Sequence, residues 1–118
     1  MAYLLLIVED GVERRSRPVD SGRLAYDRMA GFTQSLKARG VLRVSDSLKS
    51  DSEGVRVRVR DGRRFVVDGP FTESKEIIGG FFVLDCRTRG EALAIANECP
   101  AAEWATVELR EVGPCYGD

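Results

Sequence analysis

The residues best suited to chemistry gather at one corner of the chain, Asp68-Gly69-Pro70-Phe71. Gly69 permits unusual backbone angles and Pro70 fixes φ, so together they set the direction of the chain just past a strand end. Asp68 is therefore a carboxylate held at a rigid corner, where it can accept hydrogen bonds from following backbone N–H groups as an Asx-turn. This corner is where we expect a functional site.

Charged side chains follow the corner closely. A cleft that held both Asp68 and Glu73 could run general acid–base chemistry without histidine, if burial kept one of them protonated. In the simpler interpretation, Asp68 only caps a turn and its charged neighbours form a solvated face. We take Asp68 as the candidate catalytic residue, and the candidate binding residues are its neighbours and one helix arginine: Gly69, Pro70, Phe71, Glu73, Lys75 and Arg28.

A second cluster is rich in arginine: Arg56, Arg58, Arg60, Arg63 and Arg64. Guanidinium groups suit phosphate or carboxylate, so the cluster could bind an anion or nucleic acid. We prefer the simpler interpretation, the exposed face of an amphipathic hairpin that charge keeps soluble. The sequence has no helix-turn-helix or aromatic RNA-binding motif and a net charge of −1, so we expect no nucleic-acid partner.

Cysteine and histidine usage narrows the chemistry further. The chain has no histidine, which excludes Cys-His and Ser-His catalytic pairs. Its three cysteines, Cys86, Cys99 and Cys115, are widely spaced and odd in number, so they predict reduced thiols and no disulfide framework. We expect no metal and no cofactor, and only Cys115 is expected to be reactive.

Composition indicates one globular domain over residues 1–118, with 43% hydrophobic and 31% charged residues. The apolar run Tyr3–Val8 lacks a basic leader and is too short to span a membrane, so it predicts a buried strand in a cytoplasmic protein with no membrane partner. Charge is uneven: residues 1–64 carry 14 Lys/Arg and 9 Asp/Glu, whereas residues 65–118 carry 4 and 10.

Helix signals occur twice. The first helix follows a charged loop over Glu9–Asp20, starts with a cap at Asp20 or Ser21 and ends before Gly40. The second starts at a capping box and runs through Glu98 or Cys99, ahead of Pro100. The inward stripes are predicted to hold Ala25, Met29, Phe32 and Leu36 in the first helix, and Leu93, Ala96 and Cys99 in the second.

Strand signals fill the rest of the chain. Val41–Leu48 and Ala105–Val112 are predicted strands, Thr72–Ile78 is a single helical turn or an ordered loop, and Gly79-Gly80 leads into strand Phe81–Asp85. Val55–Arg60 alternates perfectly and pairs with Arg63–Val67 as a hairpin. A two-residue loop would pair Arg58 with Phe65. We prefer a three-residue loop that pairs Val57 with Phe65 and Val55 with Val67, because it keeps the apolar face intact.

The element order is β-α-β, a hairpin, then β-α-β. This order predicts an α+β, ferredoxin-like βαβ-hairpin-βαβ sandwich. With two helices on one face of the sheet, the other face needs a cover, and a second subunit would supply it.

The residues of the corner and beyond resemble a known family, the DGPF-domain or YCII-related proteins. The similarity covers about residues 3–112, and its most specific part is Asp68-Gly69-Pro70-Phe71, then Thr72–Glu76, then Gly79–Asp85. Similar stretches occur in the first helix (Phe32–Leu42), the hairpin (Val57–Gly62), the second helix (Glu91–Leu93, Cys99–Ala102) and the last strand (Val107–Val112).

The resemblance implies a homodimer that joins sheet to sheet, the dimeric α/β-barrel arrangement, and a pocket near Asp68. Some relatives are suspected enzymes with a His–Asp pair, and others are associated with alternative sigma factors of transcription. Since this chain has no histidine, only the Asp half of the pair carries over.

Two functions follow as hypotheses. One is a small-molecule binding protein or enzyme with an acidic pocket at Asp68 and a small anionic or aromatic ligand. The other is a non-catalytic regulatory or interaction module. Whether the chain is an enzyme is left open at this point.

Overall fold

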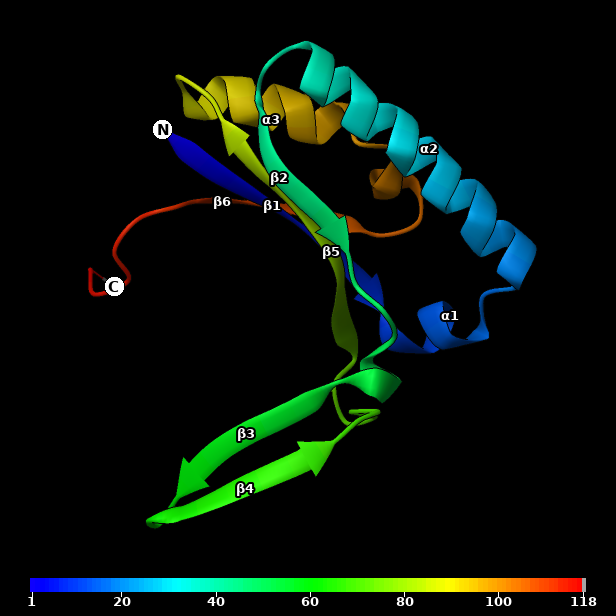
Figure 1. Ribbon diagram of the computed structural model, residues 1–118, viewed down its shortest axis with the longest axis vertical. Coiled ribbons are helices and arrows are strands. Elements are labelled where there is room, and N and C mark those ends of the chain that lie inside the picture. The colour runs from blue at the N-terminus through cyan, green and yellow to red at the C-terminus, as the bar shows by residue number, and fades with distance from the viewer. Residues whose placement is uncertain (118) are drawn as a thin grey trace.

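The computed structural model describes residues 1–117. Its body is an antiparallel sheet of four strands in the order β2-β5-β1-β6, with helices on one face (Figure 1). This confirms the predicted ferredoxin-like α+β fold. The elements are β1 (Ala2–Asp10), α1 (Gly11–Ser16), α2 (Val19–Ala38), β2 (Leu42–Ser47), β3 (Val55–Arg60), β4 (Arg63–Asp68), β5 (Glu76–Asp85), α3 (Arg89–Glu98) and β6 (Thr106–Glu111), with 3₁₀ turns η1 (Asp51–Glu53) and η2 (Pro100–Glu103). Within residues 1–117, no helix is long and apolar enough to cross a membrane.

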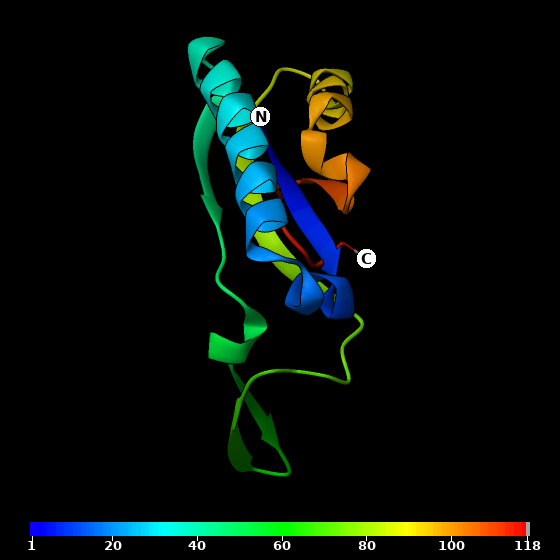
Figure 2. The same cartoon turned by 90° about the vertical axis from the view of Figure 1, so that its right-hand side faces the viewer.

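Alternation along β1 decides where the core sits. Tyr3, Leu5 and Ile7 are buried on the side that faces the helices, because successive strand side chains point to opposite faces. From α2, Phe32 packs edge-on against Phe82 of β5, with ring centroids 5.4 Å apart. Figure 2 shows α2 and α3 side by side over this same face of the sheet.

The other face of the sheet is apolar but only partly buried. We call it the open face, and its apolar residues are Leu4, Leu6, Val8, Val44, Ile78, Phe81 and Val83. Both long helices of the described chain lie on the opposite side (Figure 2). The open face is therefore the surface that a second subunit would be expected to cover.

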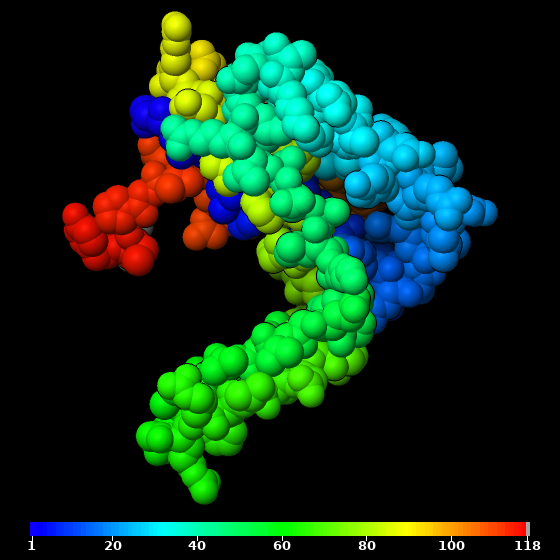
Figure 3. All heavy atoms as spheres, in the orientation of Figure 1, coloured from blue at the N-terminus to red at the C-terminus, as the bar shows by residue number. Residues whose placement is uncertain are grey.

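The hairpin β3–β4 forms a separate two-stranded sheet that stands clear of the body (Figure 3). Every residue of both strands is exposed. The predicted three-residue loop is wrong: Arg58 pairs with Phe65, and Val57 pairs with Val66. Asp61 and Gly62 have φ of 52° and 75°, as a two-residue type I′ turn requires. An apolar face still forms, because Val66 lies opposite Val57.

Other boundaries also differ from the prediction. The expected loop over Glu9–Asp20 contains α1, because the Asp10 side chain accepts from the Glu13 N–H at 2.9 Å and so caps a helix. Helix α2 begins at Val19, with Pro18 at the N-cap position instead of a capping Asp20 or Ser21.

Strand β5 and helix α3 hold the remaining differences. Strand β5 begins at Glu76, so the predicted turn or loop over Thr72–Ile78 ends early. Gly80 continues the strand because it pairs with both β1 and β2, whereas Gly79 is the extra residue where the register with β1 shifts between Ile7 and Val8. In α3 the capping box is confirmed, but Leu93 is 45% exposed, and Ala92 and Ile95 are buried instead.

Candidate small-molecule site

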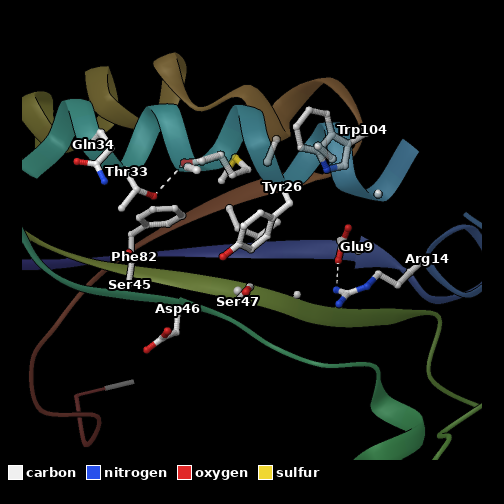
Figure 4. Close-up of a pocket in the computed structure, with 18 of the residues that line it drawn as sticks. Glu9, Arg14, Tyr26, Thr33, Gln34, Ser45, Asp46, Ser47, Phe82 and Trp104 are labelled. Carbon is white, nitrogen blue, oxygen red and sulfur yellow. Dashed lines mark hydrogen bonds and ion pairs between the residues drawn. The ribbon is translucent and has the colours of Figure 1, made fainter. Parts of the chain in front are cut away.

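A cavity of about 700 Å³ lies between α2 and the sheet, next to the edge strand β2 (Figure 4). The side chains of α2 explain its position. In the second half of the helix, Phe32 and Leu36 are buried against the sheet, whereas Gly22 and Ala25 in the first half are too small to fill the same space. The gap beneath α2 is therefore large enough to hold a small molecule.

Apolar side chains from several elements line this cavity. Ile7 comes from β1, Met29 from α2 and Phe82 from β5, and Trp104 follows η2. Trp104 is the only tryptophan of the chain. In Figure 4, the Tyr26 ring reaches down from α2 toward the strands, between Phe82 and Glu9. These walls suit the apolar or aromatic body of a ligand.

A buried carboxylate lies at one end of the cavity. Glu9 of β1 is only 5% exposed, and its carboxylate accepts hydrogen bonds from Arg14 and, at 3.0 Å, from Arg17. Arg14 also donates to the Leu48 carbonyl at 2.7 Å, which ties the last turn of α1 to the residue after β2. We call Glu9, Arg14 and Arg17 the Glu9 cluster. Its buried charge is compensated, as a buried carboxylate requires.

Gly79 of β5 makes room for the Glu9 cluster. A Cβ atom at this position would overlap both the Glu9 carboxylate and the Arg14 guanidinium. The first glycine of the sequence signature therefore has a physical reason: β5 passes so close to a buried ion pair that a side chain at Gly79 would displace Glu9 or Arg14.

The cavity is positively charged overall. The Glu9 cluster brings two guanidinium groups to one carboxylate, and the rest of the lining adds Lys37, Arg43 and Asp46. The Arg17 guanidinium uses only one nitrogen on Glu9. A positive end beside apolar walls favours a ligand with an anionic group and an apolar body over a cationic one.

Asp68, the predicted catalytic residue, lies outside this cavity. It ends β4 opposite Val55, and it is exposed. Its neighbour Gly69 lies against η1: the Gly69 N–H donates to the Gly54 carbonyl at 2.8 Å, and a Cβ on Gly69 would overlap the backbone oxygen of Asp51. The corner thus joins the hairpin to the body.

Phe71 completes that joint. It is 7% exposed, its N–H donates to the Asp51 carboxylate at 3.2 Å, and the Arg56 guanidinium lies 3.9 Å from its ring centroid. Arg15 also donates to Asp51, at 3.1 Å. The Gly69–Pro70 peptide bond is cis. These contacts fix the point at which the hairpin β3–β4, which we call the arm, leaves the body.

The other predicted binding residues are dispersed. Glu73 pairs with Arg56 at 3.4 Å, and Lys75 is exposed. Arg28 binds Glu103 and lies 5.4 Å from the Trp104 ring centroid, outside the cavity. Its hydrogen bonds lower the pKa of the Glu103 carboxyl. None of these side chains gathers around Asp68.

Sequence reasoning missed the Glu9 cluster, although a signal was present. The buried positions of β1 recur every second residue through Ile7, and the next position in that series is Glu9. A carboxylate on the buried side of a strand needs cationic partners, and Arg14 and Arg17 follow shortly after it. Assigning Glu9–Asp20 to a loop hid this relation.

The three cysteines differ in burial. Cys86 and Cys99 are buried, and burial raises the pKa of both thiols, whereas Cys115 is exposed. Within residues 1–117, no three Cys, Asp or Glu side chains gather as a metal site would require.

Comparison with known proteins agrees with the fold. An uncharacterised protein of Rhizobium meliloti is 42% identical over 45 residues, a stretch that covers 38% of this chain and 36% of that relative. The model of the YCII-related domain matches residues 1–115. Because that match covers nearly the whole chain, the protein belongs to the YCII-related family.

Proposed function

We propose that this protein binds a small anionic molecule with an apolar or aromatic body in the cavity beneath α2. The observation that carries the proposal is the Glu9 cluster, which places two guanidinium groups on one buried carboxylate in a cavity wall. Such a cluster costs desolvation energy that folding alone does not require, since apolar residues could fill the same space. A binding role explains why it is there.

Arg17 is the best placed anion-binding residue of the cluster. Its side chain is 22% exposed, and it engages Glu9 through one terminal nitrogen, so other donors of its guanidinium are free to reach a ligand. Arg14 already donates to both Glu9 and the Leu48 carbonyl. In this proposal Glu9 and Arg14 hold Arg17 in place, and Arg17 contacts the anionic group.

The proposal concerns binding, and a catalytic role for Asp68 stays a prediction. Asp68 lies outside the cavity, so the acidic pocket expected around it is not the site proposed here. The alternative role, a regulatory or interaction module linked to alternative sigma factors, also stays a prediction. It depends on surfaces other than this cavity.

Trp104 provides the test, because the only tryptophan of the chain lies in the cavity wall. Titration with benzoate and phenyl phosphate should change its fluorescence, and neutral benzamide and cationic benzylamine should bind more weakly. Arg17→Met should weaken benzoate binding roughly tenfold, because it removes a charge-assisted hydrogen bond.

Arg23→Met is the matched control. Arg23 lies on α2, is exposed and does not line the cavity, so its loss should leave benzoate binding unchanged. Preferential binding of benzylamine, or equal losses in Arg17→Met and Arg23→Met, would show that the proposed anion site is wrong.

We also propose that the protein is a homodimer, joined through the open face. Seven apolar side chains on one sheet face form a patch of a kind that monomers rarely leave in water. Light scattering should give a mass near twice the 13.1 kDa of one chain. Phe81→Glu should shift it to the monomer, whereas Leu93→Glu, the same change at an exposed position of α3 on the other side of the sheet, should not. A monomeric wild-type protein at micromolar concentration would contradict the dimer.

A further inference from the structure

The hairpin arm has two chemically different faces. Residues paired directly across an antiparallel ladder share a face, so the register sorts the arm. One side, the valine face, carries Val55, Val57, Val59 and Val66, with Arg64 and Asp68 at its ends. The other side, which we call the arginine face, carries Arg56, Arg58, Arg60, Arg63, Phe65 and Val67.

Most cations of the arginine face have no anionic partner. Arg56 at the base pairs with Glu73. Farther out, Arg58 lies 5.7 Å from the Phe65 ring centroid, and Arg60 donates to the carbonyl of its own neighbour Val59. Within residues 1–117, no carboxylate pairs with Arg58, Arg60 or Arg63. The outer half of this face is an unneutralised cationic surface.

The unpaired arginines destabilise the arm. Arg60 and Arg63 lie directly opposite each other, and like charges in that relation destabilise a ladder. A lone two-stranded hairpin is already marginal in water, and neither face of this one packs on the body. If the arginines only kept the hairpin soluble, two of them would not need to lie directly opposite each other. An anionic partner would remove the repulsion.

We propose that the arginine face binds an acidic protein segment in an extended conformation. Arg56, Arg58 and Arg60 recur every second residue of β3, at intervals of roughly 6.6 Å. An extended chain repeats its same-side side chains at the same interval, so acidic residues at alternate positions would meet successive arginines. The outer edge of β3 has no strand beside it, and a segment added there would give the three strands that an independent sheet needs.

Charge outside the arm favours a protein segment over nucleic acid. The hairpin carries five Arg and two Asp, whereas the other 104 residues carry 13 Lys/Arg and 17 Asp/Glu. A long polyanion would meet the acidic body, but a short segment needs to reach only the arm. The proposal does not depend on the cavity or on its ligand.

The test measures fluorescence anisotropy of a labelled peptide, Glu-Thr-Glu-Val-Glu-Thr-Glu, at about 0.1 M salt, where the Debye length is about 10 Å. We expect Arg60→Ser to weaken binding roughly three- to fivefold, as loss of one surface ion pair would. Combining it with Arg58→Ser and Arg63→Ser should exceed about tenfold. Arg64→Ser is the matched control, since it removes the same charge from the valine face and should change binding less than about twofold.

Two competitors complete the design. A peptide of the same composition with its glutamates together, Glu-Glu-Glu-Glu-Thr-Val-Thr, should bind more weakly, because its acidic groups do not match the spacing of the arginines. A single-stranded thymidine oligonucleotide of equal charge should also bind more weakly. The proposal is overturned by equal losses in Arg60→Ser and Arg64→Ser, by tighter binding of either competitor, or by no binding. Unchanged thermal unfolding of the variants would confirm that folding is not the cause.

Discussion

Glu9 and Asp68 are both carboxylates at the ends of strands, yet their surroundings are opposite. Glu9 is buried, neutralised by two arginines and set in the wall of a cavity. Asp68 is exposed at the base of the arm, and the glycine and phenylalanine that follow it make the contacts with the body. The comparison shows that a rigid chain direction and a functional carboxylate are separate properties. The sequence signature supplies the first, and in the proposed function the Glu9 cluster supplies the second.

Removing Glu9 should have the largest effect. Glu9→Ala leaves Arg14 and Arg17 without their shared anion, and breaking a fully buried pair in this way costs about 3–5 kcal/mol. Both guanidinium groups are about one-fifth exposed and can turn toward water, so we expect about 2–3 kcal/mol, measured by urea unfolding. Glu13→Ala, an exposed carboxylate on α1, should stay within about 0.5 kcal/mol. Similar losses in the two variants would remove the distinction between buried and exposed sites.

Substituting Gly79 tests the same cluster from the opposite strand. Gly79→Ala forces a methyl group into the space of the Glu9–Arg14 pair, and overpacking of this kind costs about 1–3 kcal/mol. Gly31→Ala is the control, because its Cβ meets nothing within 4 Å in the middle of α2. It should stabilise the protein by about 0.5–1 kcal/mol through helix propensity. If Gly79→Ala were also stabilising in urea unfolding, the close packing around Glu9 would be contradicted.

Substituting Gly69 tests the joint of the arm. Gly69→Ala should move the arm away from η1, because the added methyl group overlaps a backbone oxygen that cannot turn aside. We expect a global loss of only about 1 kcal/mol, since the arm buries little surface. The clearer readout is limited proteolysis: trypsin should cut Gly69→Ala in the arginine-rich arm several-fold faster than wild type. Gly113→Ala, in open space near the C-terminus, should leave the cleavage rate unchanged.

The fold was predictable because its signals are periodic and local. The capping box of α3 and the alternation of β3 each specify an element without knowledge of its neighbours. The hairpin register was not predictable in this way, because two pairings keep an apolar face: Val57 opposite Phe65 with a three-residue turn, or Val57 opposite Val66 with the two-residue turn that the structure has. Local pattern thus located the strands, and turn geometry decided how they pair.

The site was harder to predict than the fold. Asp68 drew attention because glycine and proline mark it in the sequence, yet those residues serve the joint with Asp51. The Glu9 cluster brings β1 together with Arg14 of α1 and Arg17 just after it, in a segment that was expected to be a loop, and it depends on a glycine 70 positions later. Long-range contacts of this kind leave no local pattern, apart from the position of Glu9 on the buried side of its strand.

Asp68→Asn should have the smallest effect on stability. It also tests whether Asp68, and not only the Glu9 cluster, takes part in ligand binding. Asp68 is exposed and ends its strand opposite Val55, so loss of its charge should change unfolding by less than about 0.5 kcal/mol. Benzoate binding at Trp104 should also stay unchanged, because Asp68 does not line the cavity. Arg17→Met in the same titration shows how large the loss of benzoate affinity is when a residue of the proposed site is removed. If Asp68→Asn weakened ligand binding as strongly as Arg17→Met, Asp68 would have to reach the ligand in some assembly of the chain. A dimer in which one subunit's arm approaches the other's cavity would then be the arrangement to examine.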